Sequence, residues 1–323
     1  MDGRGTVGDL GIWNDEQIPG LAELARIIET HGAVPAIQIG HAGRKASTQR
    51  PWEGNRPLTL DPQGMTMAWQ TVGPSPVPIQ EGWPVPTPLD ETDLAGIVES
   101  FRAATVRAVE AGYQLIEIHA AHGYLLHSFL SPIANLRRDQ YGGSLENRMR
   151  FPLEVVAAVR GAMPPGLPLS VRISAVDGAE GGWQLPDSIE FSRRLKGLGV
   201  DIVDCSSGGI QASATASRSP QAVKRGPGFQ VPFADAVKKE AQIPTIAVGL
   251  IVEPEQAERI LAEGKADLIA IGREALLNPN WPLHARLALD SDTSYSFWPP
   301  QYGWWLNRRP KLSLQGSEQR SES

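Results

Sequence analysis

Short runs of apolar and β-branched residues alternate with segments of helical periodicity along most of this chain, and this alternation limits the possible folds more than any other feature. A strand, a helix and a second strand form the repeating unit of a parallel sheet, because the helix returns the chain to the same edge. The pattern therefore predicts an α/β protein. The expected strands comprise residues 34–39, 114–118, 169–173, 201–205, 245–248 and 268–271.

The helices between these runs carry their own start and stop signals. Apolar residues from 94 to 109 recur at the spacing of one helix face, and this pattern stops at Gly112. Pro254 opens a second helix, which stops at Gly264. Residues 17–30 predict a third helix, and it precedes the first recognisable strand. It therefore belongs to a unit whose own strand the sequence does not show.

The loops decide between an open sheet and a barrel. No G-x-G-x-x-G motif follows the early strands, so the dinucleotide fingerprint of the doubly wound sheet is missing. In (β/α)8 barrels a phosphate often binds at the loops after the last two strands. Gly249 follows one of these strands, and Gly272 and Arg273 follow the other. Glycine lets backbone N–H groups approach a phosphate, and arginine adds a charged fork, so the sequence favours the barrel.

The number of strands is smaller than a (β/α)8 barrel requires, because the sequence shows only six. We therefore expect an incomplete TIM barrel whose first two strands are missing from this chain. Residues 1–306 are expected to form this barrel, and residues 51–88, rich in proline and glycine, to form a lid-like excursion over one end of the sheet. Residues 307–323 are polar without periodicity and are expected to be a disordered tail.

Composition narrows the choice of partner. The net charge of −6 and the pI of about 5.6 argue against nucleic acid or an anionic membrane and favour a small molecule. Cys205 is the only cysteine, so an intrachain disulfide cannot form. The N-terminus lacks an apolar signal core, and no run approaches the roughly 18 apolar residues of a membrane span. These features predict a cytoplasmic protein.

Two histidines, His119 and His122, stand at the end of the second expected strand. Residues three apart face opposite ways on a strand but the same way on a turn, so the pair works together only if the strand ends near His119. Gly123 favours such a turn. Glu117 shares the strand parity of His119 and is expected to be structural.

The residue pattern alone leaves three interpretations of this pair open. It could belong to a metal site, although His127 is the only further histidine nearby and zinc-like spacing is lacking. It could supply two hydrogen-bond donors to a substrate oxygen that gathers negative charge, with Tyr124 as proton donor. It could also consist of two structural histidines.

Residues 119–151, HAAHGYLLHSFLSPIANLRRDQYGGSLENRMRF, resemble the signature of the Old Yellow Enzyme family, which comprises FMN-dependent ene-reductases on a (β/α)8 barrel. Residues 37–45, IQIGHAGRK, match the family as well. The sequences HAGRKA, at 41–46, and PPQY, at 299–302, are similar to the thermophilic-like branch that includes xenobiotic reductases. Further matching segments in family order are 73–75, 171–173, 180–183, 204–209 and 272–274.

The resemblance implies how FMN would be held. Gln38 would hydrogen-bond the pyrimidine edge of the flavin, since an amide both donates and accepts. Arg172 would lie beside flavin N1 and the C2 oxygen, where reduction leaves negative charge that a permanent cation stabilises. Gly249, Gly272 and Arg273 would hold the FMN phosphate, in agreement with the strand-end glycines.

The resemblance also implies the reaction. His119 and His122 would bind the carbonyl or nitro oxygen of an activated alkene, hydride from the flavin would enter the β carbon, and Tyr124 would protonate the α carbon. NADPH or NADH would reduce the flavin from the same pocket. The implied substrates are α,β-unsaturated aldehydes and ketones, maleimides and nitro compounds, and the implied assembly is a homo-oligomer.

The chain departs from the family pattern at both ends. Family members begin with a segment that bears the first two strands and a Ser-Pro-Met motif that contacts the flavin, and this chain lacks it. At the other end Gly303, Trp304 and Trp305 stand where many relatives have an arginine that reaches the neighbouring subunit, and an aromatic wall could replace it. Two further interpretations follow: a non-enzymatic remnant unable to retain FMN, and a metal-dependent barrel hydrolase.

Overall fold

The computed structural model describes residues 2–59, 68–212, 219–290 and 294–308. The chain divides into two compact units. The first comprises Met1–Leu250 with Ile260–Ala270, and the second comprises Ile251–Arg259 with Ile271–Ser323. Of the expected disordered tail, all but residues 307 and 308 lies outside the described residues, as does part of the excursion at 51–88.

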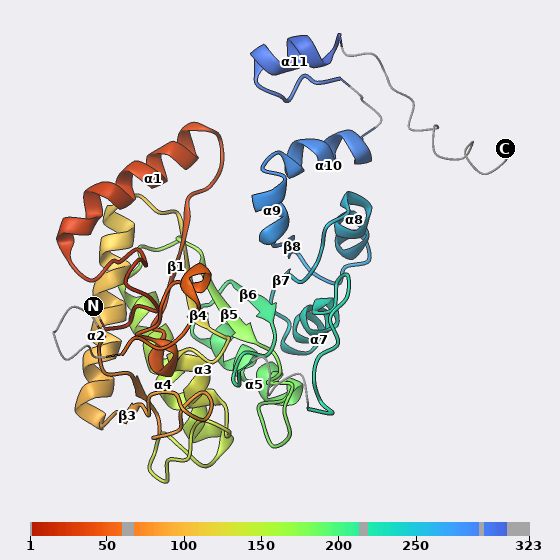
Figure 1. The fold of residues 1–323 in the computed structure, drawn as a ribbon. Coiled ribbons are helices and arrows are strands. Elements are labelled where there is room, and N and C mark those ends of the chain that lie inside the picture. The colour runs from red at the N-terminus through yellow and green to blue at the C-terminus, as the bar shows by residue number, and fades with distance from the viewer. Residues whose placement is uncertain (1, 60–67, 213–218, 291–293, 309–323) are drawn as a thin grey trace. The chain divides into compact units, whose positions relative to one another are not determined.

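A six-stranded parallel sheet forms the centre of the first unit, in the order β1-β4-β5-β6-β7-β8 (Figure 1). Each strand pairs with its neighbours along the chain, which is the order of a barrel rather than of an open doubly wound sheet. Each of the six predicted runs overlaps one strand, so the predicted α/β barrel class is confirmed. The strands are β1 (Ala36–Ile39), β4 (Leu115–Ala120), β5 (Leu169–Ser174), β6 (Ile202–Ser206), β7 (Thr245–Ala247) and β8 (Leu268–Ile269).

Helices connect the successive strands of this sheet. The predicted helix at 94–109 lies within α2 (Glu91–Glu110), which starts where Asp90 accepts a hydrogen bond from the Asp93 backbone N–H. It stops before Gly112, whose φ of 88° suits glycine. Helix α1 (Ile18–Thr30) precedes β1. The other helices between strands of the sheet are α3 (Leu125–Leu130), α4 (Leu145–Ala162), α5 (Leu185–Gly197), α7 (Val231–Ala241) and α8 (Pro254–Ala262).

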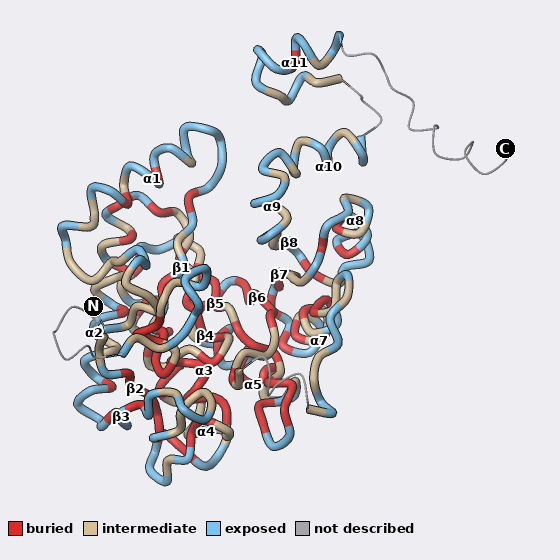
Figure 2. Tube along the Cα trace, in the orientation of Figure 1, coloured by how far each residue is buried: buried red, intermediate tan, exposed pale blue. Residues whose placement is uncertain are grey.

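The apolar core occupies one face of the sheet. Ile116, Ile118, Val171 and Val203 alternate with polar residues along their strands and are completely buried. Burial of such a side chain contributes about 1.5–3 kcal/mol. Figure 2 shows buried positions gathered along β4, β5 and β6. Because side chains alternate along a strand, the residues between these four point to the opposite face, where the polar groups collect.

A small second sheet lies within the predicted excursion at 51–88. Strands β2 (Val72–Gly73) and β3 (Thr87–Pro88) pair in parallel, each with only two residues. The sequence did not predict this pairing, because two residues are too short for a recognisable alternation. Whether the excursion acts as a lid stays a prediction.

The second unit is helical in the described residues. It contains α9 (Arg273–Leu277), α10 (Trp281–Leu289) and α11 (Pro300–Leu306). The indole of Trp281 donates to the Val252 carbonyl at 2.6 Å, which ties α10 to the start of this unit. Trp304 and Trp305 remain 51% and 68% exposed, and their predicted contact with a partner subunit stays a prediction. Among the described residues no helix combines the length and apolar character needed to cross a bilayer.

Candidate functional site

Two rows of polar residues run across the sheet on the face opposite the buried isoleucines. The strand register places Gln38 beside Glu117 and Glu117 beside Ser170. One step further along the strands, His119 lies beside Arg172, and Arg172 lies beside a buried aspartate, Asp204. The register of parallel strands therefore gathers residues from four distant parts of the sequence on one surface.

The first row is a closed hydrogen-bond network. The Gln38 amide donates to Glu117 Oε1 at 2.7 Å, and the Ser170 hydroxyl donates to Glu117 Oε2 at 2.7 Å. A carboxylate only accepts hydrogen bonds. The amide nitrogen of Gln38 therefore faces Glu117, and the side-chain carbonyl oxygen of Gln38 points away from Glu117. Glu117 thus orients Gln38, as expected of a structural residue.

The second row pairs a cation with a buried acid. Arg172 Nε lies 3.4 Å from Asp204 Oδ2, and Asp204 is 3% exposed. Burial raises the pKa of Asp204 to about 7, while the charge of Arg172 acts in the opposite direction. Neither Arg172 Nε nor Asp204 Oδ1 has a hydrogen-bond partner among the described residues. Asp204 lies in the family-like segment 204–209, but the sequence pattern does not indicate a role for it.

The chain turns sharply where β4 ends, as the sequence predicted from Gly123. His122 and Gly123 have positive φ angles of 57° and 74°, and the Tyr124 N–H donates to the Ala121 carbonyl at 3.1 Å. Two positive φ angles inside such a hydrogen bond are typical of a type I′ turn. The turn brings the rings of His119 and His122 to 5.2 Å, centroid to centroid, and sets Tyr124 edge-on to His119 at 4.7 Å.

Burial keeps these three side chains uncharged at neutral pH. It lowers the pKa of His119 to about 3 and that of His122 to about 2, and the nearby cation of Arg172 adds to both shifts. Burial likewise raises the pKa of the Tyr124 hydroxyl. Each neutral imidazole carries one N–H donor, and Tyr124 keeps its proton. His119 Nδ1 is buried without a hydrogen-bond partner among the described residues.

The ring of His122 is held by a relay of side chains that the sequence did not predict. His122 Nε2 lies 2.7 Å from the Ser206 hydroxyl. The hydroxyls of Ser206 and Ser207 reach Gln230 Oε1 at 3.3 and 2.7 Å, and the Gln230 amide donates to the Val248 carbonyl at 3.1 Å. Ser206 has one proton to donate, so Gln230 and His122 compete for it, and the tautomer of His122 depends on the outcome.

The third histidine of the segment, His127, is completely buried and has partners of its own. Its Nδ1 accepts the Gly123 N–H at 2.8 Å, and its Nε2 lies 2.9 Å from Asp177 Oδ1. Asp177 Oδ2 accepts from Ser131 and from the Trp183 backbone. Within the described parts of the chain, no three His, Cys, Asp or Glu residues are grouped as metal ligands would be. The metal interpretation therefore lacks a third ligand there.

The predicted phosphate residues fall in different units. Gly249 belongs to the first unit, and its φ of 121° requires glycine. Gly272 and Arg273 belong to the second unit, where Arg273 begins α9. A phosphate site formed by these three residues stays a prediction.

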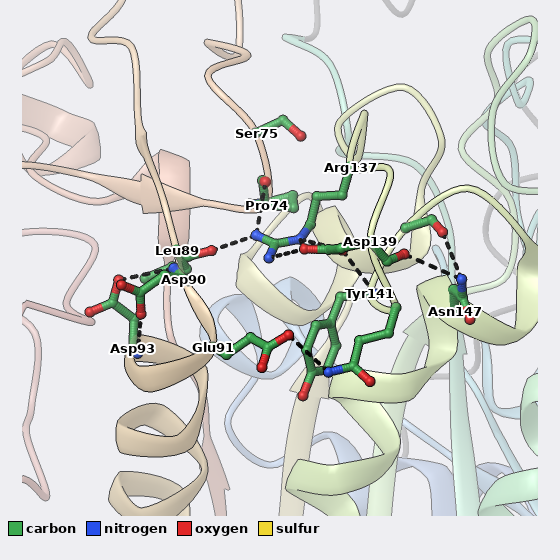
Figure 3. Close-up of polar contacts among 12 residues, drawn as sticks. Pro74, Ser75, Leu89, Asp90, Glu91, Asp93, Arg137, Asp139, Tyr141 and Asn147 are labelled. Carbon is green, nitrogen blue, oxygen red and sulfur yellow. Dashed lines mark hydrogen bonds and ion pairs between the residues drawn. The ribbon is translucent and has the colours of Figure 1, made fainter.

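The later half of the family-like segment anchors loops. Arg137 donates to the carbonyls of Leu89 and Pro74 at 2.5 and 3.4 Å and pairs with Asp139 at 2.6 Å (Figure 3). The Asn147 amide in turn donates to the Asp139 carbonyl at 3.3 Å. These contacts tie the loop after α3 to the excursion that contains β2 and β3. Arg137 and Asn147 therefore have a structural role in holding these loops.

Comparison with known proteins gives a consistent result. The sequence model of the NADH:flavin oxidoreductase / NADH oxidase family matches residues 1–291. An NADPH dehydrogenase of Geobacillus sp. (strain WCH70) is 41% identical over 304 residues, which span 94% of this chain and 80% of the relative. An NADPH dehydrogenase of Geobacillus thermodenitrificans (strain NG80-2) is 43% identical over 88% of this chain and 75% of its own length.

Solved structures agree in fold. Morphinone reductase in complex with tetrahydroNAD matches with a TM-score of 0.69 and 27% identity, over 94% of this chain and 78% of its own. A 2-naphthoyl-CoA reductase complex matches with a TM-score of 0.71 and 27% identity. This match covers 87% of the present chain, which spans only 42% of that larger protein.

Proposed function

The chain belongs to the NADH:flavin oxidoreductase / NADH oxidase family, and from this premise we propose that it reduces the activated C=C bond of α,β-unsaturated carbonyl or nitro compounds. NAD(P)H would be the hydride source and FMN the carrier. Relatives named NADPH dehydrogenase support the choice of a nicotinamide donor.

The residues on the polar face fit FMN. Gln38 is held by Glu117 so that its carbonyl oxygen points away from that carboxylate, as a contact with a flavin N–H requires. Arg172 offers a permanent cation, and its Nε has no hydrogen-bond partner among the described residues. Bound FMN would accept a hydride from the nicotinamide and pass it to the substrate. Gln38 and Arg172 would bind its ring, and Gly249, Gly272 and Arg273 its phosphate.

The observation that carries the proposal is the paired orientation of His119 and His122, with rings 5.2 Å apart. Two neutral imidazoles in a buried place can donate two hydrogen bonds to one oxygen and stabilise the negative charge that it gathers as hydride arrives. Tyr124, edge-on to His119, would give its phenolic proton to the α carbon. The hydride and this proton together saturate the double bond.

The test begins with purified protein supplied with FMN. A flavin spectrum that NADPH bleaches anaerobically and 2-cyclohexenone restores would support the proposal. His119→Ala and His122→Ala should each slow this restoration about 100-fold, the usual effect of losing a charge-stabilising donor. His31→Ala serves as the matched control, because His31 is exposed beyond the end of α1.

Three outcomes would contradict the proposal in different ways. A bound and reducible flavin that no activated alkene reoxidises would refute the substrate class. A colourless protein free of metal would favour a remnant that cannot retain FMN. A colourless protein with stoichiometric zinc would favour the hydrolase interpretation.

A further inference from the structure

The turn that carries His122 is held by side chains from three other elements. The His122 N–H donates to Ser174 at 2.9 Å, and the His122 carbonyl accepts from the Lys45 ammonium at 2.6 Å. The Gly123 N–H donates to His127 at 2.8 Å. A non-glycine residue with positive φ costs about 1–2 kcal/mol, so His122 keeps this conformation only because its surroundings impose it.

The turn also crosses the loop after β6 in backbone contact. A Cβ atom on Gly123 would lie 2.3 Å from the Gly209 carbonyl oxygen, and one on Gly209 would lie 2.5 Å from the Cα of His122. Both glycines have positive φ. The two loops therefore approach as closely as glycine alone permits.

Lys45 donates a hydrogen bond to each of the two crossing loops. Its ammonium, from the 3-10 turn η2 (Gly43–Lys45) after β1, donates to the Gly209 carbonyl at 2.5 Å as well as to that of His122. Ser174 makes a parallel bridge, because its hydroxyl donates to the Gly208 carbonyl at 2.8 Å. Among the described residues no carboxylate forms an ion pair with Lys45, so its charge acts on the two carbonyls.

We propose that Lys45 is a positioning residue: by binding the carbonyls of His122 and Gly209 together, it keeps His122 in its left-handed conformation and its imidazole beside His119. This inference rests on the proposed function, in which that imidazole donates to the substrate oxygen. The hydrogen bonds of Lys45 go to backbone carbonyls and not to the imidazole.

Loss of the ammonium has a specific consequence. Two carbonyls at a crowded crossing lose their donor, and the strain at His122 is then relieved by rotation of its peptide toward negative φ. Rotation moves the imidazole away from Ser206 and from His119, which stays in place because it belongs to the regular strand β4. Misplacement of a binding group by about 1 Å can reduce a rate about 100-fold.

The experiment compares wild type, Lys45→Met and Lys224→Met with FMN bound. Lys224 is an exposed lysine in a loop and serves as the control. Two reoxidation rates of the reduced protein are measured, one with 2-cyclohexenone and one with O2, which has no carbonyl to polarise. We expect Lys45→Met to slow reoxidation by the enone about 10- to 100-fold and to change the rate with O2 less than about threefold.

A second readout does not depend on activity. NMR of ¹³C-labelled histidines, assigned by single substitutions, reports the environment of each ring. Lys45→Met should shift the His122 signal and leave those of the exposed His31 and of His284 unchanged. Lys45→Gln keeps one hydrogen-bond donor, so its enone rate and its His122 signal should lie between those of Lys45→Met and wild type. If Lys45→Met does not fold, Lys45→Gln takes its place in the comparison with wild type.

The outcomes separate this inference from the proposed function. The role of Lys45 would be overturned if Lys45→Met kept both the enone rate and the His122 signal of the wild type. A parallel fall of both reoxidation rates and of FMN affinity would also overturn it, by showing general damage. If the wild type itself does not react with enones, the proposed function fails, and the His122 signal still decides whether Lys45 holds the turn.

Discussion

His119 and His122 lie with their rings 5.2 Å apart and tilted by 48°, yet neither carries a charge at neutral pH. Burial and the cation of Arg172 make a second positive charge here unfavourable. A pair of neutral donors can bind an oxygen before and after it gains negative charge, without first losing a proton of its own.

We predict that neither histidine titrates near 6.5, its ordinary pKa, because their pKa values in the folded protein are about 3 and 2. NMR titration of labelled histidines should show that His119 and His122 stay neutral down to about pH 4. A mid-range titration of either ring would contradict the assignment of neutral donors.

The same shifts predict acid instability. Below pH 6.5 the unfolded chain binds protons at these histidines and the folded chain does not, so the free energy of unfolding falls as pH decreases from 6.5 toward 3. Each histidine contributes a slope of at most about 1.4 kcal/mol per pH unit. Urea unfolding of wild type and His119→Asn at pH 7 and pH 5 measures the effect, and the variant should lose less stability. Equal losses would exclude His119 as a source.

Asp204 should have the opposite effect on how the free energy of unfolding depends on pH. Its folded pKa of about 7 lies above its unfolded value, so the folded state holds the extra proton and loses this stabilisation as pH rises from about 4 through 7. We therefore expect Asp204→Asn to become more stable relative to wild type between pH 5 and pH 8. Urea unfolding at both values is the measurement. A difference that is constant with pH would show that Asp204 is already ionised in the folded protein.

Gly123→Ala should be strongly destabilising. The new Cβ would lie 2.3 Å from the Gly209 carbonyl oxygen, and alanine is strained at a φ of 74°. Together these effects should cost about 2–5 kcal/mol of unfolding free energy. Gly96→Ala is the matched control, because Gly96 lies inside α2 with open space around it; this variant should gain about 0.5–1 kcal/mol. Equal stabilities for the two would contradict the close crossing.

The buried pair of His127 and Asp177 should matter far more than a surface pair. Asp177→Ala removes the partner of His127 and leaves the hydroxyl of Ser131 without its acceptor, so it should cost about 3–5 kcal/mol of unfolding free energy. Asp235→Ala breaks the more exposed pair with Lys239 on α7 and should cost about 1 kcal/mol or less. Thermal and urea unfolding compare the two; a small effect at Asp177 would mean that the core relaxes around the gap.

Strands and helices were predictable because their signals are local. The strand at 169–173 and the helix opened by Pro254 follow from residues within a few positions, and the structure has both with small differences at the ends. The short pair β2 and β3 was not predictable, since two residues carry no period. The turn at Gly123 was predictable, because a glycine directly after the strand and His122 is itself a local signal.

The residues that support His122 could not be predicted in the same way. Lys45 and Ser174 lie 77 and 52 positions from His122 in the sequence, and Gln230 lies further still. A lysine after a strand, a serine at a strand end and a glutamine before a helix are common, and none of them signals a contact. His127 has the same difficulty, because its direction depends on which way α3 packs.

The sequence by itself determined the alternation of strands and helices, the end of β4 near His119 and the presence of His122 and Tyr124 beside it, since all of these depend on interactions between near neighbours. Only the tertiary structure decided that the imidazoles are neutral, that His127 pairs with Asp177 and that Lys45 closes the crossing of two loops. The physical reason is that burial and long-range hydrogen bonds exist only once the parallel strands have brought distant segments together.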